Sequence, residues 1–137
     1  MKRVVAAVAA VLLTGAAASA QSYPGDTGAG VQRGIQQLNN SGAVGTVTLY
    51  GRGAATRVLL ALQGVPGGPQ AAKVVRGIDC DHMTSIQAYN LHDVRQGASL
   101  STVQAPEAKL LSGNYNVVVF SSTARGARPI ACGNLYT

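Results

Sequence analysis

Short apolar runs recur along the chain between clusters of Gly, Asn, Ser and Pro. The strongest turn signals are Asn39-Asn40-Ser41-Gly42 and the stretch Gly64-Val65-Pro66-Gly67-Gly68-Pro69. A separation of roughly 8–14 residues between β-branched runs is typical of an antiparallel sandwich or barrel. We therefore predict an all-β fold of about eight strands. The predicted strands are 31–38, 44–50, 57–63, 73–76, 86–91, 100–104, 115–121 and 130–135.

Helical signals are weak by comparison. Residues 105–111 form the one candidate helical turn, with Pro106 near its first position and Gly113 after its end. A polar loop crossing between two strands explains the same residues, and both interpretations stay open at this stage.

The first 20 residues have the pattern of a secretory signal peptide. Lys2 and Arg3 precede an apolar run over residues 4–13, and Ala18-Ser19-Ala20 supplies a cleavage site of small residues. The run is shorter than the ~20 residues that a membrane span requires, which disfavours a retained anchor. We expect a secreted or periplasmic protein with a loose tail over 21–29, a β-sandwich domain over 30–137 and no transmembrane segment after cleavage.

Charge excludes one class of partner. Without Lys2 and Arg3 the chain keeps nine basic residues against five acidic ones, a net charge of +4. The basic residues are dispersed and have no aromatic residues between them, so we expect no nucleic-acid binding. Mild attraction to anionic cell-envelope polymers stays open beside simple solvation of the charges. The sequence names no envelope or extracellular partner, no ligand and no oligomeric state.

Export bears on the two cysteines of the chain, Cys80 and Cys132. In an oxidising compartment two lone cysteines are expected to pair. On the chain-entropy estimate, a bridge that closes a loop of about 53 residues stabilises the fold by ~4 kcal/mol.

Several segments, in order along the chain, resemble the copper/zinc superoxide dismutase family. Residues 42–50 and 58–65 look like the first half of that fold, and Gly77-Ile78-Asp79-Cys80 resembles the segment with the first disulfide cysteine. The most specific match is Pro129-Ile130-Ala131-Cys132-Gly133-Asn134-Leu135, which is similar to the terminal strand with the second cysteine. The resemblance spans about residues 30–136 and implies a Greek-key β-sandwich or flattened barrel like that of exported bacterial relatives.

The same comparison removes the copper chemistry. Aligned on Gly77, the first two copper-ligand positions fall on Lys73 and Val75, and a later one falls on Phe120, or on Val119 if the register slips by one. Pro129 stands at the position of the arginine that guides the substrate, with Arg128 one place earlier. A redox copper centre needs several imidazoles, and the whole chain holds two histidines.

Those two histidines are the remaining metal candidates. His82 and His92, with Asp81 and Asp93 nearby, lie where the resemblance implies zinc ligands. Two imidazoles and a carboxylate suit zinc, but a separation of ten residues is not a compact ligand motif. We expect no metal and no cofactor, and keep zinc at these four residues as the alternative.

Other catalytic sites are weakly indicated. Serines and His–Asp neighbours are present, but no G-x-S-x-G nucleophile elbow is found. We assign no catalytic residue. The sequence favours a non-catalytic binding or structural module on a superoxide dismutase-like scaffold. The alternatives are a metal-binding or dismutase-like protein with an atypical site, and a self-associating envelope protein.

Overall fold

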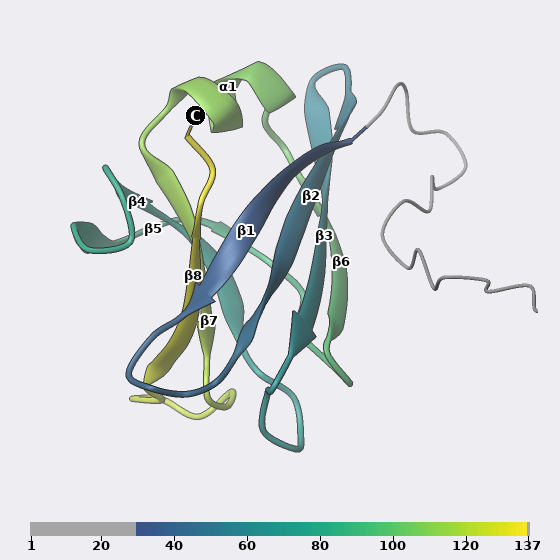
Figure 1. Cartoon of the computed structure of the whole chain (residues 1–137). Coiled ribbons are helices and arrows are strands. Elements are labelled where there is room, and N and C mark those ends of the chain that lie inside the picture. The colour runs from purple at the N-terminus through teal and green to yellow at the C-terminus, as the bar shows by residue number, and fades with distance from the viewer. Residues whose placement is uncertain (1–29, 137) are drawn as a thin grey trace, which may run out of the picture.

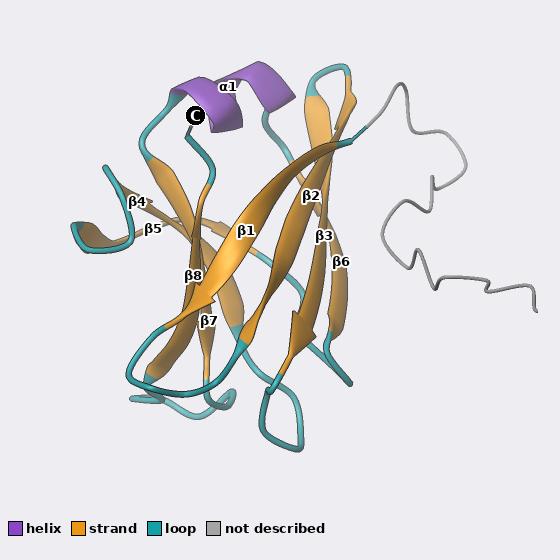
Figure 2. Cartoon of the chain, in the orientation of Figure 1, coloured by secondary structure: helices purple, strands orange, loops and turns teal. Residues whose placement is uncertain are grey.

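The computed structural model describes residues 30–136 and folds them into eight antiparallel strands and one short helix (Figure 1, Figure 2). The predicted all-β class is confirmed, and every predicted strand overlaps an observed one. The predicted signal peptide (1–20) and tail (21–29) lie outside the described residues. The elements are β1 (Val31–Gln37), β2 (Val44–Arg52), β3 (Ala55–Gln63), β4 (Ala72–Gly77), β5 (Met83–Asn90), β6 (Ala98–Val103), α1 (Glu107–Ser112), β7 (Tyr115–Phe120) and β8 (Pro129–Asn134).

The strands follow the order β5-β4-β7-β8-β1-β2-β3-β6 in one curled sheet. Within the described residues, the ladder between its two halves, β1-β2-β3-β6 and β5-β4-β7-β8, pairs Gln36 with Cys132 and Gln37 with Ala131. Figure 1 shows β1 crossing between the halves, which gives the molecule the shape of a half-barrel. Within the described residues no ladder joins β5 to β6, so the sheet does not close.

The main hydrophobic core lies between the two halves of the sheet. In strands such as β3, β4 and β7, alternate residues point into this core, as the period of two in a β-strand requires. The core takes fully buried side chains from both halves, including Val47, Leu49, Val58, Leu60, Val74, Val117 and Val119. The opposite faces of β4, β7 and β8 are therefore free to form a separate surface, which carries the site described below.

The predicted helical turn is present as α1. The carbonyl of Pro106, at the N-cap, accepts from the Leu110 N–H at 3.3 Å, and the Gly113 N–H donates to the Lys109 carbonyl at 3.0 Å. Leu110 is fully buried and anchors the helix on the core. Of the two interpretations left open by the sequence, the structure has the helix. In the described part of the chain, no helix is long and apolar enough to cross a membrane.

Strand boundaries differ most at β5, which begins at Met83 and not at the predicted Ile86. Its pairing with β4 is irregular, with register shifts between Val74 and Val75 and between Val75 and Gly77. Of the added residues, Thr84 and Ser85 are polar and exposed, and the half-buried Met83 packs outside the main core, so hydrophobic periodicity does not reveal them.

Candidate functional site

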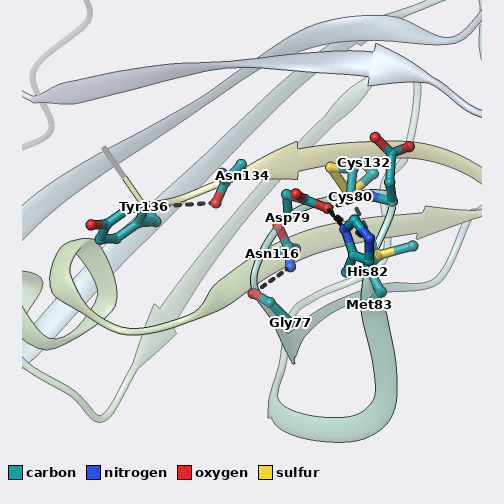
Figure 3. The surroundings of a disulfide bond; sticks show 10 residues. Gly77, Asp79, Cys80, His82, Met83, Asn116, Cys132, Asn134 and Tyr136 are labelled. Atoms are coloured by element: carbon teal, nitrogen blue, oxygen red, sulfur yellow. Dashed lines mark hydrogen bonds and ion pairs between the residues drawn. A yellow bond between two sulfur atoms is a disulfide. The ribbon is translucent and has the colours of Figure 1, made fainter.

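The predicted disulfide between Cys80 and Cys132 is confirmed. Cys80 lies in the loop after β4 and Cys132 in the middle of β8, with their Cα atoms 5.9 Å apart. The bond ties the 78–82 loop to the outer side of the sheet (Figure 3). Cys132 is fully buried and Cys80 is 8% exposed, so the bond is shielded from solvent thiols.

We call the surface around this bond the disulfide face; it is the outer side of β4, β7 and β8. A second, small hydrophobic cluster covers it, separate from the main core. The Sδ atom of Met83 lies 3.5 Å from the Sγ atom of Cys132 and closes the cluster from the β5 side (Figure 3). The cluster consists of Val75, Cys80, Val118 and Cys132, with Leu38, Met83 and Phe120 packed against it.

The positions that the resemblance assigns to copper ligands lie on this face. Val75 belongs to the cluster, and the Nζ atom of Lys73 lies over the Phe120 ring, 5.5 Å from its centroid. Val119 points to the other side, into the main core, so Phe120 shares a face with Lys73 and Val75. An aliphatic group and a phenyl ring offer no lone pair to a metal, and an ammonium repels one. These residues therefore do not fit a copper ion.

The loop that covers the face is organised by the carboxylate of Asp79. Its Oδ1 atom accepts from the backbone N–H groups of Asp81 and His82, each at 2.9 Å, and lies 2.8 Å from Nδ1 of His82 (Figure 3). The hydrogen bond to Asp79 raises the pKa of His82, and the same bond lowers the pKa of Asp79. Both side chains are exposed, at 70% for His82 and 41% for Asp79. The pair fixes the turn at the surface.

The four zinc candidates are not brought together. His82 precedes β5 and His92 follows it, so an extended strand of eight residues separates them. The backbone of His92 is held against β6, because its N–H donates to Ser101 Oγ at 2.8 Å and its carbonyl accepts from Ser99 Oγ at 2.7 Å. Asp93 lies 4.0 Å from Arg95. Across residues 30–136, no group of three or more His, Cys, Asp or Glu could hold a metal.

The His82–Asp79 pair also lacks a nucleophile. Within the described residues, no serine hydroxyl is hydrogen-bonded to the imidazole of His82, whose one side-chain partner is Asp79. Pro129, at the position of the guiding arginine, opens β8, and Arg128 is exposed with its carbonyl bonded to the Ser121 N–H at 2.8 Å.

One buried polar residue beneath the loop was missed by the sequence analysis. Asn116 of β7 is fully buried and donates from Nδ2 to the Gly77 carbonyl at 3.0 Å, while its Oδ1 atom has no partner among the described residues (Figure 3). An asparagine in the apolar run Tyr115–Phe120 is the signal that could have found it, because asparagine is depleted in strands.

No protein-family model matches the chain, and no curated protein matches it.

Proposed function

We propose that this protein is an exported, non-catalytic binding or structural module on a superoxide dismutase-like Greek-key β-sandwich that has lost its copper site. The observation that carries the proposal is the chemistry of the disulfide face. Lys73, Val75 and Phe120 occupy the implied ligand positions and contribute a cation, an aliphatic side chain and a phenyl ring. A surface of this composition packs and binds, but it does not hold a redox metal.

The strand order supports the choice of scaffold. β6 lies beside β3, and β7 lies between β4 and β8, so three connections (β3–β4, β5–β6 and β6–β7) cross from one half of the sheet to the other. The disulfide joins the segment after β4 to the last strand, the two segments whose cysteines the resemblance pairs. A fold by itself does not determine an activity, and it is the side chains of the disulfide face that favour a non-catalytic role.

Export is supported by the cysteines. A buried disulfide in a chain with no free cysteine among its described residues is typical of proteins that fold in an oxidising compartment. Together with the signal-peptide pattern over residues 1–20, this favours a secreted or periplasmic location. Mass measurement of the protein recovered outside the cytoplasm tests it, with cleavage after Ala20 as the expected result.

Metal content and dismutation activity test the main proposal. We expect the exported, oxidised protein to contain copper and zinc far below one equivalent and to show no superoxide dismutation above a blank. Near-stoichiometric metal with activity would overturn the proposal. The double variant Lys73→His/Phe120→His is the informative comparison, because it restores two imidazoles at the implied positions. Copper retained by that variant but not by the natural chain would support the assignment of these positions.

A further inference from the structure

We propose that the loop between β7 and β8 forms, with Lys73, a binding site for a phosphate or sulfate group. A pocket of about 370 Å³ lies between this loop and the start of β4. It is lined by Lys73 and Phe120 on the sheet side and by residues 122–127 on the loop side. This inference deepens the proposed function by giving the binding module a class of ligand.

The charges of the pocket carry the argument. Lys73 and Arg125 line it, and no Asp or Glu does. Lys73 is half-buried, and in the described part of the chain neither it nor Arg125 forms an ion pair. A cation without a carboxylate partner is available to an anion that enters the pocket. The Phe120 ring, whose centroid lies 5.5 Å from Nζ, holds the ammonium at the pocket.

The loop adds neutral donors to these cations. Ser122 Oγ accepts from the Ala124 N–H at 3.1 Å, which leaves its hydroxyl proton available, and Thr123 is exposed beside it. Over the described residues, the backbone N–H groups of Thr123, Arg125 and Gly126 donate to no protein acceptor. Backbone N–H groups without a protein acceptor are available to an anion that enters the pocket.

Backbone hydrogen bonds within the loop and across its ends fix its conformation. The Ser121 N–H donates to the Arg128 carbonyl at 2.8 Å, and the Ala127 N–H donates to the Ala124 carbonyl at 3.1 Å. Gly126 adopts a φ of 82°, in the left-handed region that favours glycine. The pocket therefore combines two cations and two hydroxyls with no carboxylate in its lining, a composition that suits a tetrahedral oxyanion.

The test is a titration of the oxidised full-length mature protein with inorganic phosphate, followed by NMR of the backbone amides at low ionic strength. We expect saturable shifts over residues 122–127. Lys73→Met, which keeps a flexible apolar side chain against Phe120, and Arg125→Gln should each weaken binding about tenfold, the value of one charge-assisted hydrogen bond. Lys109→Met removes an exposed charge from α1 outside the pocket, and should bind phosphate like the natural chain.

The other arms separate the sources of the anion. Sulfate that binds as phosphate does would indicate a site for any tetrahedral oxyanion, and tighter binding of polyphosphate would assign the group to a polymer. Chemical-shift changes that do not saturate with phosphate would overturn the inference. A loss of phosphate binding in Lys109→Met equal to that in Lys73→Met and Arg125→Gln would also overturn it. Failure of the phosphate titration together with low metal content would reject the oxyanion site and leave the proposed function standing.

Discussion

At the scale of single residues, the loop over the disulfide depends on the carboxylate of Asp79. One oxygen accepts two backbone N–H groups and the imidazole of His82. Asp79→Asn keeps an oxygen acceptor for the backbone but removes the charge, so the raised pKa of His82 should fall back toward 6.5. NMR titration of the His82 imidazole measures this. Asp93→Asn, which removes a carboxylate beside Arg95, is the control and should leave the titration of His82 unchanged.

The same pair predicts a pH window for stability. The pKa of His82 is raised, so its contribution is complete below 6.5 and disappears as pH rises through the folded value. The pKa of Asp79 is lowered, so its contribution is complete above 3.8 and disappears as pH falls through the folded value. The free energy of unfolding, measured in urea, should therefore differ most between the natural chain and Asp79→Asn at pH values between 3.8 and 6.5. A difference that is constant across this range and outside it would contradict the pairing.

A further prediction concerns zinc binding by His82 and His92, the alternative kept from the sequence. His82 and His92 are held at opposite ends of β5, so one ion cannot reach both imidazoles while the strand is intact. Adding zinc to the metal-free protein should leave its melting temperature unchanged within error, because an ion that does not bind the native state cannot stabilise it. A rise that disappears in His82→Ala and in His92→Ala would contradict this expectation.

Some features of the disulfide face could be predicted from the sequence, and others could not. Two lone cysteines in a chain with a signal-peptide pattern are enough to predict their bond, since no other pairing exists. The contact of Lys73 with Phe120 was not predicted, because it depends on which strands are neighbours, and the residues are far apart in sequence. Asn116 was missed because a single polar residue in a strand does not reveal that a loop will bury it.

At the scale of elements, β2 contains a glycine whose lack of a side chain is required by its neighbour. A Cβ atom on Gly45 would lie 2.0 Å from the Ala61 carbonyl oxygen of β3, whereas a Cβ atom on Gly34 of β1 would meet nothing within 4 Å. Gly45→Ala should therefore lower the free energy of unfolding by about 1–3 kcal/mol, the range for overpacking. Gly34→Ala should change it by less than about 1 kcal/mol. Urea unfolding of both variants tests the pair, and equal stabilities would contradict the β2–β3 geometry.

The elements themselves follow from the sequence, but their arrangement does not. Runs of β-branched residues between strong turn signals indicate all eight strands, because strand residues and turn residues differ in chemistry. Periodicity contains no information on which strands pair, so the order of the sheet comes from the packing of the two halves around one core. The early start of β5 follows from its irregular pairing with β4. The pattern of apolar residues along the chain contains no information on that pairing.

At the scale of the whole molecule, the disulfide stabilises a sheet whose halves, over the described residues, share two paired positions between β1 and β8. The bond links residues 52 positions apart, and it restricts the unfolded chain accordingly. The double variant Cys80→Ala/Cys132→Ala should lose about 2–5 kcal/mol of stability, which for a domain of this size lowers the melting temperature by about 8–20 °C.

Reduction provides an independent measurement of the same contribution. Because both sulfur atoms are shielded, the reductant must act while the protein unfolds, so the comparison is a melting curve recorded with and without excess thiol. The reduced natural chain should melt with the double variant, and an unchanged curve would mean that the cysteines are not paired. The 121–128 loop has no covalent tie to the bond, so the folded fraction of the variant should keep its phosphate shifts. Loss of those shifts in a folded variant would instead make the disulfide part of the binding site.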